Sequence, residues 1–299
     1  MAGNNNQPER RYEKEFKGLL QAVFGHRAYF RDFFGGSIEA LDGVKENDTA
    51  FSVKTNDMPV VIGTYDTDAD VAFGEGTANS TRFGERKEVI YANTDVPYTW
   101  NWAIHEGIDR FTVNNEFNAA VADRLDLQAN AKTEEFNAKH SAFVSASAGE
   151  TVDATEHDNV LSLFNALAVY FTNAKTIGAR HAKVTPELYN DIVDHPAATT
   201  SKHSGANVDE NTIVKFKGFV IEELPEDAFQ DGEIVYAYIA GVGKAFTGIS
   251  TARTKESEDF DGVALQGAGL SGEYIPEDNK AAVVKVTGDL GGSGGGVEG

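Results

Sequence analysis

Four stretches of the sequence contain residues whose types and spacing could support catalysis or ligand binding. Residues 291–295 read Gly-Gly-Ser-Gly-Gly and match the pattern that places a nucleophilic serine between a strand and a helix. A poly-glycine tail predicts neither element, so we expect no nucleophile there. Gly241-Val242-Gly243-Lys244 resembles a phosphate-binding loop. However, Phe246 replaces the third glycine of the dinucleotide-binding motif, and Ala245 replaces the Ser/Thr that follows the lysine of the P-loop. We expect a turn between two strands instead.

Two further stretches contain metal-ligand residue types. Residues 66–70 read Asp-Thr-Asp-Ala-Asp, the opening of a calcium loop, but Val71 replaces the required glycine and Thr77 the twelfth-position glutamate. The sequence therefore favours a solvated acidic hairpin tip. His105-Glu106 begins like the helix of a zinc protease, but Asp109 stands where the second histidine belongs. Neither stretch predicts a metal site.

The remaining ionisable residues show no catalytic pattern. The seven histidines lack metal-ligand spacing, and His140 continues an apolar helical stripe, which is typical of a packing residue. No paired carboxylates, Ser/His/Asp set or glycine-rich phosphate cradle stands out. We therefore predict no catalytic, cofactor-binding or metal-binding residues, and we expect that the protein is not an enzyme.

Composition narrows the function further. The chain has 299 residues, no cysteine and a formal net charge of −21. An acidic protein of this kind repels phosphates, which disfavours sequence-specific binding to nucleic acids. The N-terminus carries no signal peptide, and no apolar run approaches the ~18 residues of a membrane span. These features predict a soluble protein made in the cytoplasm.

The N-terminal stretch differs in charge from the rest. Residues 1–31 contain six Lys or Arg side chains against three Glu. Such a basic arm on an acidic body indicates either an arm that docks on a neighbouring copy or an ordinary solvated first helix. Apolar spacing predicts a helix from about Arg10 to Phe34, and the aromatic residues at its end must pack on the body or on another subunit.

The longest periodic segment predicts a helix from Asn114 to Ala146. The apolar stripe comprises Phe117, Val121, Leu125, Ala129, Phe136, His140 and Phe143. Asn114 and Asn115 can cap the first N–H groups, and Glu116 suits the positive end of the helix. A single helix of this length is typical of a spine on which other elements lie. A coiled coil is the alternative, but strict heptads are absent.

Before this helix, the pattern changes to that of an extended hairpin. Residues 48–95 contain two strand-like groups around the aperiodic, Gly- and Asp-rich stretch 63–86. Such a long loop is rarely part of a compact domain, and an isolated two-stranded hairpin is marginal in water. We expect an arm that rests on something outside its own fold. The alternating residues 96–104 predict one half-buried strand.

The rest of the chain predicts a mixed region with its own small core at about 151–244. It should contain helices at 156–174 and 187–194, the latter with Thr185 as hydroxyl cap, a polar loop at 194–211, and strands at 181–184, 213–216, 219–222 and 234–240. Later strands are expected at 245–249, 262–266 and 281–286. The strands near 96–105 and 281–286 could pair beside the long helix. The fold class is α+β.

The parts follow one another as a basic N-terminal arm, a long hairpin, a spine helix, a mixed middle region and late strands. This order resembles that of the major capsid proteins of tailed bacteriophages, the Hong Kong 97-type fold, over about residues 10–286. Residues 219–223, after Lys217-Gly218, look like the family's late strand in its middle domain, and residues 184–189 look like its strand-to-helix step. Residues 260–265 through 281–286 resemble the closing strands of its peripheral domain.

The resemblance implies a division into parts. Residues 1–47 would form the N-terminal arm and 48–95 the extended hairpin, or E-loop, which lies across the adjacent subunit in this family. Residues 96–150 and 245–287 would form the peripheral domain with its spine helix, and 151–244 the axial domain. Residues 288–299 would be a flexible glycine-rich tail.

The implied function is that of a major capsid protein assembling into pentamers and hexamers of an icosahedral shell around double-stranded DNA. The expected location is the virion, after synthesis in the host bacterial cytoplasm. Expected partners are other copies of itself, a portal, possible decoration proteins and a separate scaffolding protein, because about ten residues precede the first predicted helix. Candidate subunit-interface residues are Arg10, Arg11, Lys14, Phe73, Arg82, Phe83, Arg86, Lys202 and His203.

Two alternatives stay open. An encapsulin-like cargo shell would share the fold. From a different class, an acidic surface or tail-associated binding module would use the 63–86 loop to bind its ligand.

Overall fold

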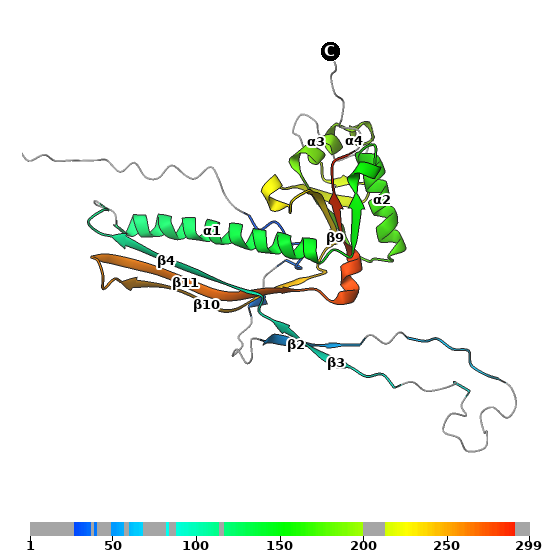
Figure 1. Ribbon diagram of the computed structural model, residues 1–299, viewed down its shortest axis with the longest axis horizontal. Helices are drawn as coiled ribbons and strands as arrows, with labels where there is room; N and C mark the ends of the chain where they lie inside the picture. Colours follow the sequence, from blue (N-terminus) through cyan, green and yellow to red (C-terminus); the bar gives the residue numbers. More distant parts are fainter. Residues whose placement is uncertain are drawn as a thin grey trace, which may run out of the picture.

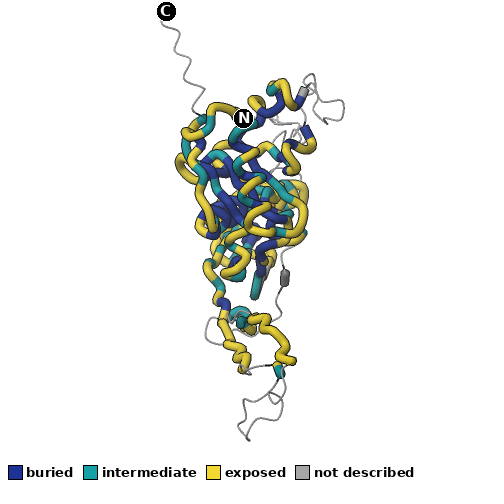
Figure 2. The backbone as a smooth tube through the Cα atoms, turned by 90° about the vertical axis from the view of Figure 1, so that its right-hand side faces the viewer, coloured by how far each residue is buried: buried dark blue, intermediate teal, exposed yellow. Residues whose placement is uncertain are grey.

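The computed structural model describes residues 27–36, 39–40, 49–56, 60–67, 82–83, 88–113, 117–199 and 213–290. Helices and strands are mixed, as expected for an α+β protein. Figure 1 shows three parts: a globular part around a sheet, a long helix lying along a narrow sheet, and a thin arm. Figure 2 shows that the buried backbone gathers in the globular part, whereas the arm is mostly exposed.

The six-stranded sheet forms the centre of the globular part. Its order is β5 (Glu150–Asp153), β12 (Val283–Thr287), β9 (Glu233–Ile239), β6 (Arg180–Val184), β8 (Phe219–Glu223) and β7 (Lys215–Phe216). The parallel pair β6 and β8 is joined through α3 (Pro186–Asp194), as parallel pairing requires a long crossover. β7 and β8 join through Lys217 and Gly218, both with positive φ, as expected for a two-residue hairpin.

Two helices bury apolar faces in the core of this part. α2 (Val160–Asn173) contributes Val160, Leu163, Phe164, Leu167 and Phe171, and α3 contributes Leu188, Ile192 and Val193. The predicted start of α2 at 156 is wrong, because a 3-10 turn (Ala154–Glu156) comes first and the side chain of Asn159 then caps the helix. Thr185 precedes α3 as predicted, but its hydroxyl makes no capping hydrogen bond. Short helical segments at Pro196–Thr199, Glu226–Ala228 and Glu277–Ala282 complete this part.

The narrow sheet has the order β1 (Glu39–Ala40), β10 (Lys244–Glu256), β11 (Gly262–Tyr274) and β4 (Trp100–Asp109). The expected pairing between the strands near 96–105 and 281–286 is therefore wrong. β11 continues to Tyr274 and takes the place beside β4, whereas β12 pairs with β9 and β5. The valines of β12 are buried, which suits a strand inside the covered sheet.

The spine helix α1 (Phe117–Ala146) lies along this narrow sheet (Figure 1). Its expected caps at 114–116 lie outside the described residues. The C-terminal half is buried through Phe136 and Val144 and through polar residues between them. The N-terminal half differs from the prediction, because Ala129 is exposed and Leu125 is 44% exposed. The expected apolar stripe is therefore only partly covered.

The alternating run from Val96 to Ile104 is divided between two sheets, so the prediction of a single strand is wrong. β3 (Ala92–Pro97) pairs with β2 (Thr49–Thr55) in the arm, and β4 begins at Trp100 and pairs with β11. Pro97 has no N–H group to donate to a ladder, which favours the end of β3 there.

The end of the N-terminal stretch packs on the body. Residues 29–36 form turns rather than the end of the predicted helix, whose residues 10–26 lie outside the described part. Phe30, Phe33 and Phe34 are nevertheless almost completely buried. The prediction that these aromatic residues find cover is confirmed, and the cover is the chain itself.

Candidate functional site: the hairpin arm and its anchorage

The arm continues beyond its two hydrogen-bonded strands. Farther along, the backbone N–H of Asp66 donates to the carbonyl oxygen of Arg82 (2.9 Å), and Arg82 Nη1 donates to the carbonyl oxygen of Asp66 (3.0 Å). The rings of Tyr65 and Phe83 meet edge to face at 5.1 Å. These contacts bring the two sides of the hairpin together again at Asp66 and Arg82, beyond the ladder between β2 and β3.

The arm exposes many apolar side chains. We define the arm strip as Val60, Val61, Ile62, Tyr65, Phe83, Val89, Ile90 and Tyr91, each of which is more than half exposed. Ile62 is 92% exposed and Phe83 83%. Burial of one such side chain contributes roughly 1.5–3 kcal/mol. So many exposed apolar side chains on one hairpin are typical of an interaction surface.

The root of the arm is fixed by an aromatic cluster. The ring of Phe51 on β2 lies 5.1 Å from that of Phe246 on β10 and 6.0 Å from that of Tyr274 on β11. Tyr98, between β3 and β4, lies 5.8 Å from Phe246. Tyr98 also covers Gly248 so closely that an added Cβ would come within 2.5 Å of its ring. The arm is thus anchored at one end and exposed along the rest.

A buried carboxyl group joins the arm root to the spine helix. Glu273 on β11 accepts hydrogen bonds from Thr99 Oγ1 (3.1 Å) and Trp100 Nε1 (3.0 Å), where β3 passes into β4. His140 on α1 lies 3.5 Å from the same carboxyl group. Burial raises the pKa of Glu273, and burial also lowers the pKa of His140 to about 4. His140 is therefore neutral near pH 7 and acts as the packing residue that the sequence predicts, against Phe34 and Phe136.

A second polar cluster fixes the 27–36 segment to the six-stranded sheet. Asp32 lies 2.7 Å from His181 Nδ1 and 3.1 Å from Lys183 Nζ, and it accepts a hydrogen bond from the Tyr238 hydroxyl (3.0 Å). Lys183 is 1% exposed and also contacts Glu222. Burial, reinforced by Asp32, raises the pKa of Tyr238 well above its usual value. Because a buried ammonium group needs charged partners, Asp32 makes this docking specific.

A third cluster joins α1 to the same sheet. Glu233 accepts hydrogen bonds from Ser145 on α1 (2.7 Å), from Lys285 on β12 (2.8 Å) and from the Tyr236 hydroxyl (2.5 Å). Burial opposes ionisation of Glu233, but these hydrogen bonds outweigh it and lower its pKa. The carboxylate therefore stays charged, and it bridges helix and sheet.

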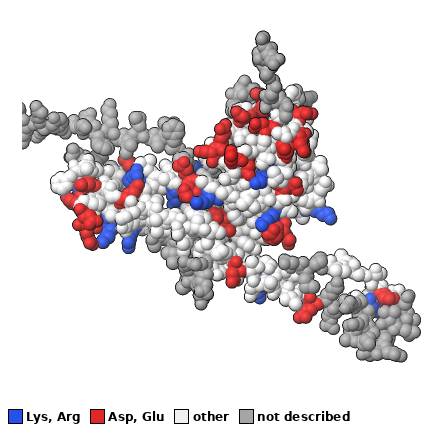
Figure 3. All heavy atoms as spheres, viewed as in Figure 1, with Lys and Arg blue, Asp and Glu red and all other residues white. Residues whose placement is uncertain are grey.

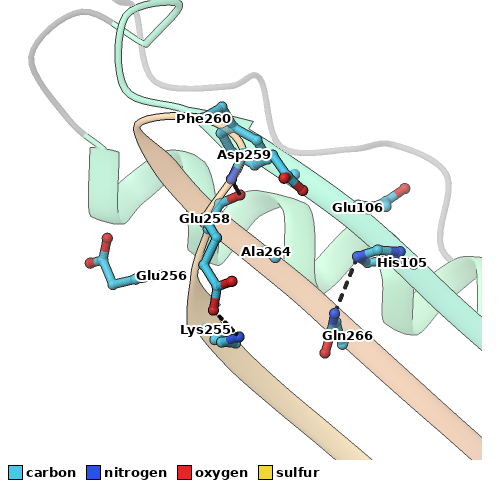
Figure 4. Close-up of a pocket in the computed structure, with 11 residues that line it drawn as sticks. His105, Glu106, Lys255, Glu256, Glu258, Asp259, Phe260, Ala264 and Gln266 are labelled. Carbon is cyan, nitrogen blue, oxygen red and sulfur yellow. Dashed lines mark hydrogen bonds and ion pairs between the residues drawn. The ribbon is translucent and has the colours of Figure 1, made fainter.

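A hollow of 330 Å³ lies where β10 turns into β11, and four acidic residues line it: Glu106, Glu256, Glu258 and Asp259 (Figure 4). Gln266 and His105 are hydrogen-bonded at 3.2 Å, and Lys255 pairs with Glu258 at 3.0 Å. Figure 4 shows the carboxylates of Glu106 and Glu256 on opposite sides rather than converging. Among the described residues, no group of three His, Asp or Glu side chains is arranged to hold a metal ion.

Several predicted residues can now be located. Arg82 and Phe83 lie together on the arm, whereas Arg10, Arg11, Lys14, Phe73, Arg86, Lys202 and His203 fall outside the described residues. His105-Glu106 belongs to strand β4 rather than to a helix. Residues 241–243 form a turn between β9 and β10, as predicted, and the N–H groups of Gly241 and Gly243 donate to the chain's own Asp32 and Phe33 carbonyls.

Sequence reasoning missed most of the arm strip and all of the aromatic anchor. Residues 60–62 looked like an ordinary strand, although three adjacent apolar residues beside a long polar loop could have suggested a contact surface. The anchor joins residues about two hundred positions apart, so no local pattern could have identified it.

Charge is unevenly distributed over the surface. On the face seen in Figure 3, Asp and Glu side chains gather over the globular part, while the described surface of the arm is largely uncharged. The arm therefore presents a largely apolar surface beside an acidic globular part.

The fold closely matches solved structures. The capsid structure of cyanophage P-SCSP1u has a TM-score of 0.67, with 93% of each chain covered at 10% identity. The mature capsid of bacteriophage PhiM1 has a TM-score of 0.64, covering 91% of this chain and 90% of that chain at 11% identity. The chain has the fold of these phage capsid structures.

This capsid fold is the Hong Kong 97-type fold that the resemblance implied. A virus-like particle from Pyrococcus furiosus is also similar, with a TM-score of 0.51, 15% identity, and coverage of 87% of this chain and 92% of that chain. A scan against protein-family models finds no match, and a search of curated proteins finds none either. Within the described part of the chain, no helix is long and apolar enough to cross a membrane.

Proposed function

We propose that this protein is the major capsid protein of a tailed phage, which assembles with copies of itself into an icosahedral shell around double-stranded DNA. The observation that carries this proposal is the arm strip on a subunit with the capsid fold. A hairpin this thin cannot cover its own apolar side chains, so a neighbouring copy must cover them. The function is structural, and the protein acts in the virion.

The architecture supports an assignment of parts. We assign the peripheral domain to residues 96–150 with β10 and β11, and the axial domain to residues 151–244 with β12, because β12 pairs with β9. Residues 1–47 would be the N-terminal arm, 48–95 the extended hairpin and 288–299 the tail. Pentamers and hexamers, a separate scaffold, a portal and decoration proteins complete the proposed set of assemblies and partners.

Two alternatives are less well supported. An encapsulin-like cargo shell would use the same arm strip, but the virus-like particle matches less well than the two phage capsids. A binding module using residues 63–86 could also use the arm strip, because the strip flanks that loop from Val60 to Tyr91, but the solved structures that share the fold are phage capsids.

The test is a single charge placed on the arm strip. Ile62→Asp should leave the subunit folded, since Ile62 is 92% exposed, but it should reduce shell yield at least tenfold because the charge would be buried in the contact. Thr64→Asp is the matched control, because it adds the same charge at an exposed polar position of the same arm. Electron microscopy and light scattering measure shells, and circular dichroism measures folding.

Assembly of Ile62→Asp at the wild-type level would refute the arm contact. If the wild-type chain stays monomeric even when co-expressed with the neighbouring genes of its source, the capsid proposal fails and the binding-module alternative replaces it.

A further inference from the structure

The spine helix carries an apolar trough that its own described surroundings leave open. Two adjoining hollows of 260 and 320 Å³ follow α1 and share Lys132. We define the α1 trough by Leu125, Ala129, Lys132 and Phe136 on the helix, Trp102 on β4 and Ala28 at the upper end. It includes Leu125 and Ala129, the part of the helical stripe that the sequence predicts to be covered and that remains exposed.

The trough is built to receive an aromatic or aliphatic side chain. Lys132 Nζ lies 3.8 Å from the centre of the Trp102 ring and 5.4 Å from that of Phe136. Burial lowers the pKa of this amine, so it already sits in an apolar setting. Another ring placed over the ammonium group would add a further cation–π contact and would cover the exposed side chain of Leu125.

The described chain begins at this trough. The side chain of Asn137 holds the entering backbone, because its Nδ2 donates to the carbonyl oxygen of Arg27 (2.8 Å) and its Oδ1 accepts from the N–H of Tyr29 (3.0 Å). Ala28 lines the trough itself. Phe24 is only four residues before Ala28, so it lies within about 14 Å of the trough whatever its conformation.

The residues that precede Arg27 match the trough in chemistry. Phe16, Leu19, Leu20, Val23 and Phe24 have the spacing of one apolar helical face. A helix of residues 16–24 spans about 12 Å, close to the rise from Leu125 to Thr133 along α1. Its neighbours Lys14 and Lys17 would then bring positive charge to the N-terminal half of α1, which carries Asp123 and Asp126.

We propose that the apolar stripe of residues 16–24 docks into the α1 trough of its own chain. The hairpin arm is a poorer occupant within the same chain, because it leaves on the side of the narrow sheet away from α1 (Figure 1). The interaction joins the basic N-terminal stretch to the spine helix and extends the docking that Asn137 and Asp32 begin. It does not depend on the proposed capsid function.

The first test is disulfide trapping, which is clean because the chain has no cysteine. The full chain with Val23→Cys and Thr133→Cys places one thiol on the stripe and one at the trough. The control pair, Val23→Cys with Glu135→Cys, uses an exposed position that does not line the trough. We expect the first pair to form an intrachain disulfide at least tenfold faster, seen as a fast monomer band without reductant.

Two outcomes would overturn the proposal. Disulfide-linked dimers from the Thr133 pair would mean that a second copy fills the trough. Equal rates for the two pairs would mean that the stripe does not dock there.

A second measurement avoids cysteines, in case a pair fails to fold. Trp102 lines the trough and is one of two tryptophans in the chain. Leu20→Asp should release the stripe and about double the acrylamide quenching of tryptophan fluorescence. Ala22→Asp adds the same charge off the stripe and should leave quenching unchanged. An identical effect of both substitutions, or of neither, would contradict the docking.

Discussion

At the scale of single residues, the structure depends on polar groups held inside the core. Asn137, Ser141 and Ser145 lie on the buried side of α1, where each has a defined partner: the backbone of Arg27 and Tyr29, the carbonyl oxygen of Ala228, and the carboxylate of Glu233. Each partner comes from a different element. These hydrogen bonds therefore fix the position of the spine helix against the rest of the molecule.

His140 should make stability depend on pH. Its pKa is about 4 in the folded chain and about 6.5 when unfolded, so the unfolded chain takes up the proton first as pH falls. The free energy of unfolding should drop by up to about 3 kcal/mol between pH 6.5 and 4. The His140→Gln variant has no imidazole to protonate, so its free energy of unfolding should not show this drop. Urea titrations of unassembled subunits across this range measure the difference between the two proteins.

The neighbouring Glu273 acts in the opposite direction. Its raised pKa means that the folded chain binds this proton more tightly, which offsets part of the loss as pH falls. Wild type and His140→Gln both retain Glu273, so the difference between their free energies of unfolding reports on His140 alone. Parallel pH curves for wild type and His140→Gln would show that His140 is not desolvated as the structure indicates.

These buried polar residues could not be identified from sequence. Asn137, Ser141 and Ser145 look like residues of a solvent-facing helical side, because a buried polar residue differs from an exposed one only in its distant partners. His140 was predicted as a packing residue because it continued an apolar stripe. Apolar periodicity thus identified Phe136 and His140 on the buried face and missed Asn137, Ser141 and Ser145.

At the scale of elements, the arm and the narrow sheet meet through the aromatic anchor. Phe51→Ala should remove the contacts with Phe246 and Tyr274 and weaken the root of the arm by about 2 kcal/mol, since Phe51 is half-buried. Amide hydrogen exchange in β2 and β3 should accelerate, while exchange in β9 should not change. Phe111→Ala is the control, because Phe111 is 82% exposed. Unchanged exchange in β2 and β3 would show that backbone pairing alone holds the arm.

Helices and strands were predicted best where the local sequence pattern alone determines the secondary structure. The spine helix and most strands of the globular part were found from local patterns. The division of the 96–104 run was missed because side chains keep alternating while the chain passes from one sheet to another. The pairing of β12 with β9 and β5 was missed because consecutive valines indicate that a strand is buried but not which strands lie beside it.

At the scale of the whole molecule, charge sets the conditions for assembly. A chain with a net charge of −21 repels its copies, whereas in the proposed shell the arm strip would attract them through apolar burial. Raising NaCl from about 50 to 500 mM shortens the screening length roughly threefold and should speed shell formation. Light scattering over time measures the rate. Slower assembly at high salt would mean that ion pairs between subunits outweigh the general repulsion.

The continuity between β3 and β4 has a mechanical meaning. Only Tyr98 and Thr99 separate the last strand of the arm from the ten-residue strand β4, so arm and sheet share one nearly unbroken backbone. Tension applied along the arm would be transmitted along the backbone of β4, which is hydrogen-bonded to β11 in a ladder along its length. The hydrogen bonds of that ladder would then be sheared together instead of being peeled apart one by one. The subunit would resist tension along the arm far better than tension across it.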